Sequence, residues 1–427
     1  MWSDRSIIRI SLLSGVGTIA ALAIALGTTA MHHEPATDWY PIYQRGLADL
    51  DQQRDRDALE HFRQVALGTE EPNLHRAAAK AYAHTYADVG AVDAAYLDFQ
   101  RIDPAAAREL LELLADRYLE EGKSGDATRA YQQLIALAPA DRNVCLWQYN
   151  VAHAALTSPS STNADKVAKI EDLVHRWRSI GPVLPAAERA VCHDNAAAMS
   201  GDLAHAYHRE STKSHGDDSL AFAERLYAIF LDAFPDHPSF AMNQYYYAEL
   251  LWKLAQRERN PRLQAALWDR VADAFADVLA TGRVEPKVRK EAGYAAVLAR
   301  KSAAGDTPLG EAVSDAMSER EQRLVAACDR YIADFADLHD DDLVSMKFLE
   351  AKLYRRHRHF DESIARYQEI LAQRRDHETA EMSARLLLDI YDELHRRGDL
   401  VALADSLRAD KKFLADKPDL ARRLARY

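Results

Sequence analysis

The stretch Arg108-Glu-Leu-Leu-Glu-Leu-Leu-Ala-Asp-Arg-Tyr118 decides the fold of this chain. Its apolar side chains recur at spacings of three and four residues, which is the period of one face of an α-helix. A glycine-containing turn interrupts the pattern, a second amphipathic segment follows, and a proline ends it. We therefore expect two antiparallel helices. Ala115 and Ala127 would let them approach closely, with Tyr118 and Tyr131 filling the space beside them.

This pair of helices resembles a tetratricopeptide repeat (TPR), a helical hairpin of roughly 34 residues with small residues and aromatics at fixed positions and a closing proline. The resemblance implies that other units flank it, because a single hairpin cannot bury its own faces. The expected fold class is therefore all-α, a TPR-like α-solenoid of about nine antiparallel helix pairs.

The same spacing recurs along the chain, with units of varying length. Clear units lie at residues 75–104, 108–139, 219–235 and 343–371. Between them we expect a loop at 157–163, an unusually long helix at 186–212 and a polar end piece at 417–427. The chain then divides into a signal peptide or membrane anchor (1–31), a linker (32–38), an N-terminal TPR array (39–139), enlarged irregular helical repeats (140–238) and a C-terminal TPR array with an end cap (239–427).

The amino-terminal segment is a targeting or anchoring element. Arg5 and Arg9 precede residues 10–31, which contain no charged side chain. A bilayer is crossed by about 20 such residues, but small residues at 28–30 also suit cleavage of a signal peptide. In either case the arginines hold the amino terminus in the cytoplasm. We expect the remainder to be periplasmic, either cleaved or anchored in the inner membrane by residues 10–31.

The three cysteines are interpreted for an oxidising compartment. Cys145 and Cys192 each lie in the first helix of successive pairs, and a disulfide between them would close a loop of about 47 residues, worth roughly 4 kcal/mol. The alternative is two buried free thiols. Cys328 is expected to lie in the core.

Composition and motifs exclude several functions. The net charge of −12 argues against nucleic-acid binding, which needs a basic face. The sequence holds no phosphate-binding glycine loop, metalloprotease helix or nucleophile elbow. We expect no enzyme activity, no cofactor and no metal. His357 and His359 flank an arginine, and a solvated basic turn explains them better than a metal site does.

The TPR resemblance implies that the first helix of each pair lines a concave surface that binds partners. It assigns an acidic set and a basic set to that surface, or else both are ordinary solvated helix faces. The acidic set is Glu109, Glu112, Asp116 and Glu120, and the basic region is Phe348, Lys352, Arg355 and Arg356. A further cluster, Tyr245, Tyr246, Tyr247 and Trp252, holds more rings than one buried helix face absorbs. At least one of them should reach the surface.

These features favour a non-catalytic exported scaffold that binds protein segments or envelope-complex subunits. The chain resembles periplasmic TPR proteins of bacterial envelope machines, and Phe360-Asp-Glu-Ser-Ile364 resembles components of adventurous gliding motility. The alternatives are a membrane-anchored chaperone-like TPR protein near the secretion translocon, and the helical part of a murein-acting enzyme. No remaining stretch is long enough for the catalytic domain of such an enzyme.

Overall fold

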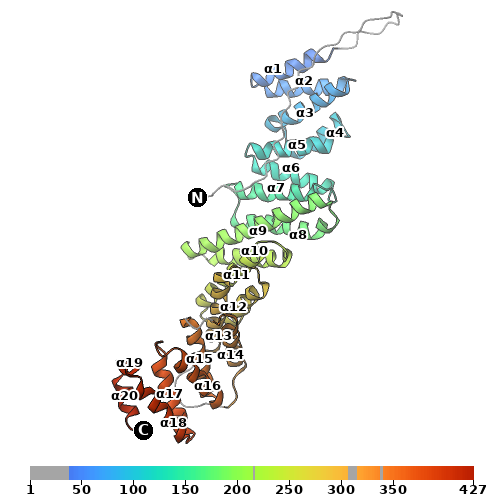
Figure 1. Ribbon diagram of the computed structural model, residues 1–427. Coiled ribbons are helices and arrows are strands. Elements are labelled where there is room, and N and C mark those ends of the chain that lie inside the picture. Colours follow the sequence, from blue (N-terminus) through green and yellow to red (C-terminus); the bar gives the residue numbers. More distant parts are fainter. Residues whose placement is uncertain (1–37, 215–216, 306–314, 337–339) are drawn as a thin grey trace, which may run out of the picture.

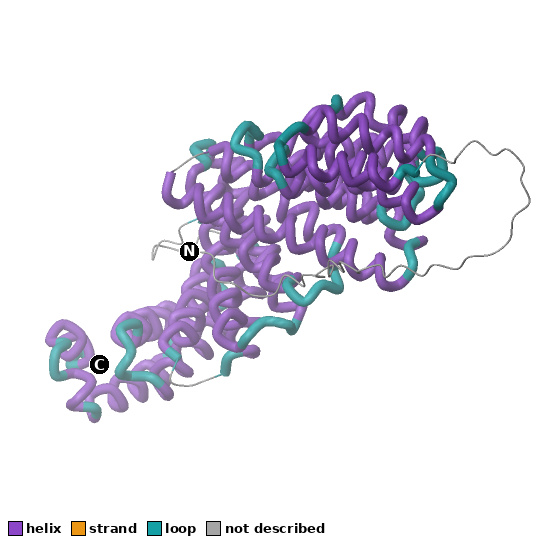
Figure 2. Tube along the Cα trace, turned by 90° about the horizontal axis from the view of Figure 1, so that it is seen from above, coloured by secondary structure: helices purple, strands orange, loops and turns teal. Residues whose placement is uncertain are grey.

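The chain folds into a rod of stacked helices. The structure, a computed structural model, describes residues 38–214, 217–305, 315–336 and 340–427. All regular secondary structure in these ranges is helical. The helices follow one another along the rod from α1 to α20 (Figure 1), and in the view from above the described residues are coloured as helices and loops (Figure 2). This all-helical rod confirms the predicted fold class.

Within the described residues, helices α1 to α18 form nine antiparallel pairs, in line with the prediction of about nine. They are α1 (Tyr40–Asp51) with α2 (Asp55–Gly68), α3 (Pro72–Val89) with α4 (Val92–Ile102), α5 (Ala107–Glu120) with α6 (Ser124–Leu137), α7 (Val144–Thr157) with α8 (Asn163–Ile180), α9 (Ala186–Ser214) with α10 (Asp217–Ala233), α11 (Phe240–Arg257) with α12 (Pro261–Thr281), α13 (Pro286–Ala304) with α14 (Glu319–Asp334), α15 (Asp341–Arg356) with α16 (Phe360–Gln373), and α17 (Ala380–Glu393) with α18 (Arg397–Ala409). Two short helices, α19 (Lys411–Leu414) and α20 (Pro418–Leu424), complete the rod.

Local sequence signals set the helix ends. The side chain of Thr162 accepts a hydrogen bond from the backbone of Asp165 and starts α8, and Ser318 with Glu321 does the same for α14. Such capping boxes satisfy backbone N–H groups that the first turn leaves free. Gly282 follows α12 with φ of 62°, a left-handed conformation that suits glycine.

Small residues bring the helices of a pair together. Ala115 and Ala127 are fully buried between α5 and α6, and Tyr131 is buried beside them. In the first pair, a Cβ atom on Gly46 would lie 2.7 Å from the Phe62 ring. Each pair then buries its remaining apolar faces against its neighbours, as a helical repeat array requires.

The middle of the chain contains longer helices than the first three pairs do, apart from α3. Helix α9 runs for 29 residues, and the loop between α7 and α8 falls within residues 158–162. The extra turns of α9 extend beyond the length that its partner α10 covers.

Two predictions about the carboxy-terminal third were wrong. The end piece is not simply polar, because Leu420 and Leu424 of α20 are fully buried and close the apolar end of the rod. The turn after α15 is not solvated at His357, which is buried with its Nε2 atom 3.1 Å from Glu321 Oε1. That contact fixes the turn against the start of α14.

The predicted targeting segment at residues 10–31 lies outside the described residues. Between residues 38 and 427, leaving aside the short gaps given above, the structure contains no helix whose length and apolar character would suit a bilayer crossing.

Candidate partner-binding face

We define the inner face as the solvent-facing side of four consecutive first helices, α5, α7, α9 and α11. Three side-chain contacts join these helices in series. Trp147 Nε1 of α7 donates a hydrogen bond of 2.8 Å to Glu112 Oε1 of α5. Cys145 of α7 is bonded to Cys192 of α9. The rings of His205 on α9 and Tyr246 on α11 stack with centroids 4.5 Å apart and planes 10° apart. The four helices therefore form one continuous surface.

The disulfide joins residues 47 positions apart in sequence. The Cα atoms of Cys145 and Cys192 are 5.7 Å apart, within the usual range for disulfides. Cys328 is a buried free thiol, as its predicted core position implies, and burial raises its pKa well above the ordinary value.

The acidic residues predicted on α5 differ in what they contact. Glu109 forms an ion pair of 3.1 Å with Lys80 of α3. Glu112 accepts the hydrogen bond from Trp147, and Asp116 accepts one from the hydroxyl of Tyr131. Glu120 is exposed to solvent.

The protein around two acidic side chains of the inner face raises their pKa values. Asp116 is exposed to solvent, yet desolvation by the surrounding protein raises its pKa, with Glu120 adding to the effect. Desolvation also raises the pKa of Glu112, and the nearby carboxylates of Asp116 and Asp141 add to it. A carboxylate that touches water but is surrounded by protein loses hydration on most sides.

Two further carboxylates on this face were missed by the sequence reasoning. Burial raises the pKa of Asp202 on α9 and of Glu249 on α11. Glu249 could have been found, since it lies four residues after Tyr245 and three before Trp252, on the same side of the helix. Asp202 lies in the 29-residue α9, whose sequence does not fix which side faces solvent.

The aromatic cluster of α11 contributes partly exposed rings to the inner face. Tyr245 packs with its ring 5.9 Å from Phe275, and its hydroxyl donates to Glu291 at 3.4 Å. Burial, together with Glu249 and Glu291, raises the pKa of Tyr245 to about 12. Trp252 packs edge-on against Trp268, with ring centroids 4.8 Å apart. Like the stacked Tyr246, these rings are half-buried, so each one packs against its neighbours and also contacts solvent.

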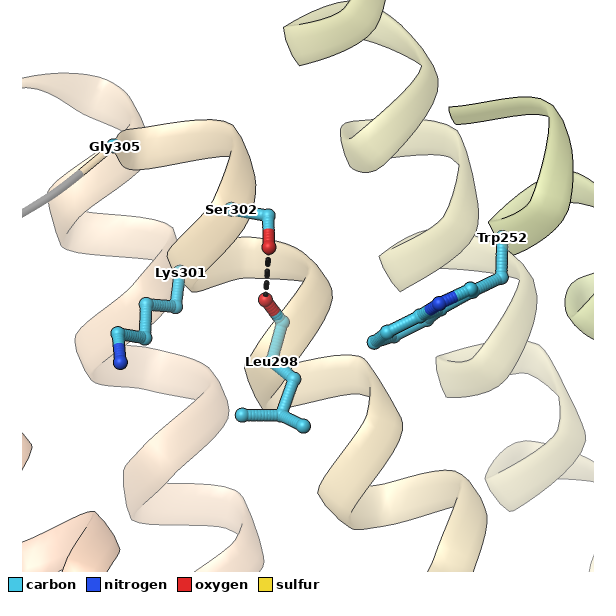
Figure 3. Close-up of a pocket in the computed structure, with 5 residues that line it drawn as sticks. All are labelled: Trp252, Leu298, Lys301, Ser302 and Gly305. Atoms are coloured by element: carbon cyan, nitrogen blue, oxygen red, sulfur yellow. Dashed lines mark hydrogen bonds between the residues drawn. The ribbon is translucent and has the colours of Figure 1, made fainter. Parts of the chain in front are cut away.

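A hollow of about 440 Å³ continues the inner face between α11 and α13. It is lined by Trp252, Leu298, Lys301, Ser302 and Gly305. Figure 3 shows the Trp252 indole pointing across the hollow toward Leu298, while Lys301 points away from it. The Ser302 hydroxyl is already donated to the carbonyl of Leu298 at 3.0 Å, and the walls of the hollow are part apolar and part polar.

The predicted basic region lies on α15, beyond the inner face. Phe348, Lys352, Arg355 and Arg356 are all half-buried. The Phe348 ring lies 6.0 Å from that of Tyr367 on α16 and so contributes to packing. The acidic and basic sets are therefore separate regions of the rod.

Two equivalent tyrosines on second helices differ in their hydroxyl contacts. Tyr131 of α6 and Tyr227 of α10 each lie four residues after a fully buried alanine, and both rings are fully buried. The Tyr131 hydroxyl donates to Asp116. The Tyr227 hydroxyl has no hydrogen-bond partner among the described residues. The shared position of the two tyrosines could have been read from the sequence, but the missing partner could not.

The described residues contain no group of three or more histidine, cysteine, aspartate or glutamate side chains that could hold a metal ion.

Comparison with known proteins gives structural matches only. No protein-family model matches the chain, and no curated protein matches it. The crystal structure of the P58(IPK) TPR domain is 13% identical, with 84% of this chain and 99% of that domain covered and a TM-score of 0.24. The structure of Naa15/Naa10 bound to HypK-THB is 11% identical, with 91% of this chain and 65% of that chain covered and a TM-score of 0.23.

Likenesses this distant carry no argument about function, and they leave the expected relation to gliding-motility components without support. The nine antiparallel pairs, the small residues between their helices and the continuous stacking carry the assignment. The chain is a TPR-like α-solenoid.

Proposed function

We propose that this protein is a non-catalytic scaffold that binds segments of other proteins along its inner face. The observation that carries the proposal is the continuous surface of α5, α7, α9 and α11, which presents half-buried aromatic rings beside carboxylates. Tyrosine and tryptophan are frequent anchors at protein interfaces because they combine large contact area with few rotatable bonds.

We further propose that the scaffold works outside the cytoplasm, in a bacterial envelope complex. Two observations support this location. Residues 10–31 are uncharged and follow two arginines, and the Cys145–Cys192 disulfide is of a kind that persists in oxidising compartments.

Site-specific crosslinking tests the binding role. A photoreactive phenylalanine derivative replaces Tyr246 in the full chain, expressed in the cells that make it. The matched control places the same probe at Leu97, which is 58% exposed on the second helix α4. The proposal expects one or two discrete adducts from position 246 and none from position 97. Equal adducts at both positions would contradict it, and a broad range of clients at 246 would favour the chaperone-like alternative.

Thiol labelling tests the location. Cells are quenched with acid, denatured without reductant and treated with a maleimide polymer that adds mass to each free thiol. An exported chain should show one modified thiol, that of Cys328. Three modified thiols would place the chain in a reducing compartment.

A further inference from the structure

The outer face of the rod, formed by the second helices, satisfies its charges by ion pairs between neighbouring helix pairs. Arg225 of α10 bonds Glu171 of α8 at 2.7 Å, and Arg270 of α12 bonds Glu224 of α10 at 3.1 Å. Arg129 of α6 similarly reaches Asp93 of α4 at 3.4 Å. These carboxylates therefore have cationic partners within the chain.

The inner face is different. Glu112, Asp116, Asp202 and Glu249 form no ion pair with lysine or arginine in the described part of the chain. Glu112 and Asp116 are instead oriented by neutral donors, the Trp147 indole and the Tyr131 hydroxyl. Neutral donors fix a carboxylate in place without cancelling its charge. Against the effect of burial, Lys253 of α11 acts to lower the pKa of Glu249, and His205 acts to lower that of Asp202. Only carboxylates act as charges on Glu112 and Asp116, so these two negative charges remain open to a cation.

Aromatic rings also lie on these helices. Tyr149 of α7 is half-buried, and its ring runs nearly parallel to that of His153, with centroids 6.2 Å apart. On α11, Tyr245 and Trp252 lie on either side of Glu249 in the helix register. Aromatic faces attract ammonium and guanidinium groups, and guanidinium also stacks on them.

The buried hydroxyl of Tyr227 is a second, independent indication of a missing ligand group. Tyr227 is fully buried, and its hydroxyl has no partner within the described residues. The Tyr227 ring packs 6.1 Å from that of His208 on α9 and 6.2 Å from that of Tyr247 on α11. Tyr246, Glu249 and Arg209 act electrostatically on the Tyr227 hydroxyl. Its counterpart Tyr131 donates to Asp116, which lies on the first helix of the same pair. Since an unsatisfied buried hydroxyl is destabilising, a bound polar group beside Glu249 would recover free energy.

We infer that the inner face binds an extended segment of a partner protein that carries arginine or lysine side chains, with cations opposite Glu112 and Asp116 at one end and Asp202 and Glu249 at the other. This inference rests on the proposed scaffold function and names the chemistry of its partner. Arginine suits the face better than lysine does, because its planar group can bond a carboxylate in two places while it stacks on a ring. An acidic segment would be repelled.

Fluorescence anisotropy with the full chain in detergent tests the inference. The probe is a fluorescein-labelled peptide of six Arg-Ala repeats, and the comparison peptide has six Glu-Ala repeats. The first should bind and the second should not. The variant E112Q/D116N/D202N/E249Q should weaken binding at least tenfold, because it removes four charges while the amides still accept the hydrogen bonds from Trp147 and Tyr131.

A matched control makes the same change of net charge away from the inner face. The variant E70Q/D218N/E378Q/D392N alters exposed carboxylates elsewhere on the rod and should leave the dissociation constant within twofold. Equal weakening by both quadruple variants would overturn the inference, as would equal binding of the two peptides. Tyr227→Phe should weaken the arginine peptide about threefold, and an unchanged constant would remove the hydroxyl from the site.

The outcome is separable from that of the proposed function. If the probe at position 246 captures a partner whose crosslinked segment has no basic residue, the scaffold role stands and the charge assignment falls.

Discussion

The two faces of the rod use charged residues in different ways. On the outer face, arginines such as Arg225 and Arg270 join successive second helices through ion pairs. On the inner face, a disulfide, an indole hydrogen bond and a ring stack make the same kind of connection between first helices. Lys253 of α11 also bonds His208 and Thr212 of α9. None of these contacts uses the carboxylate of Glu112 or Asp116 in an ion pair. Under the proposed function, the inner face combines connection between helix pairs with recognition of a partner.

Of the changes that test this comparison, removal of the disulfide on the inner face should lower the free energy of unfolding most. The double variant C145A/C192A should lower the free energy of unfolding by about 4 kcal/mol, because the unfolded chain regains the freedom of a long loop. Urea denaturation under oxidising conditions measures this. Cys328→Ala serves as the control, with a loss of about 1 kcal/mol for a small cavity. A double variant as stable as the parent would mean that the disulfide contributes nothing.

The two equivalent tyrosines should respond in opposite directions to the same change. Tyr131→Phe removes a bonded hydroxyl and should destabilise the chain by about 1 kcal/mol. Tyr227→Phe removes an unsatisfied one and should raise the free energy of unfolding by up to about 1 kcal/mol in the absence of ligand. Parallel urea titrations of both variants measure the difference. Equal losses would mean that the Tyr227 hydroxyl is satisfied in solution.

The inner carboxylates should make stability depend on pH. Their pKa values are raised in the folded state, so the folded chain binds protons more tightly than the unfolded chain does. Stability therefore falls as pH rises from the unfolded-state values, near 4, through the raised folded-state values. The variant E112Q/D116N/D202N/E249Q should have a higher Tm than the parent at pH 7, and the same Tm at pH 3. Thermal melts at both pH values, with E70Q/D218N/E378Q/D392N as control, test this sign.

The smallest effect is expected on the outer face. Arg225→Ala breaks its ion pair with Glu171, both of which contact solvent, and should lower the free energy of unfolding by about 0.2–1 kcal/mol. The loss should shrink further at 1 M salt, where screening is strong. A loss above about 2 kcal/mol would mean that outer pairs stabilise the rod as strongly as buried contacts do.

The helix pairs could be predicted because their packing is recorded locally. Small residues such as Ala115 and Ala127 and the ring of Tyr131 recur at fixed spacing, and the structure buries all three. The polar end piece was misjudged because Leu420 and Leu424 are only two apolar residues in a charged segment. His357 is buried against Glu321 of α14, which lies 36 residues earlier in the chain. Local spacing in the sequence does not reveal such a contact.

The candidate site was predicted in part for the same reason. On α5 and α11, a buried alanine fixes which residues point outward, and the predicted carboxylates of α5 and rings of α11 are exposed or half-buried. Their role in binding stays a prediction. Helix α9 is too long for that rule, and Asp202 and His205 were missed. The hydroxyl of Tyr227 is unsatisfied because of what surrounds it in three dimensions, and no sequence pattern records an absent neighbour.

The contacts between the first helices also have a mechanical consequence. A stack in which each repeat touches only its neighbours behaves as a spring, and its pitch changes when its ends are pulled. A covalent bond between α7 and α9 fixes the inner spacing there, while the ion pairs of the second helices can break and re-form. Under tension, the helix pairs that contain α7 and α9 should keep their relative arrangement, while the helix pairs at the two ends of the rod should move apart first. A partner segment bound to the central helix pairs would then stay bound when the rod is stretched.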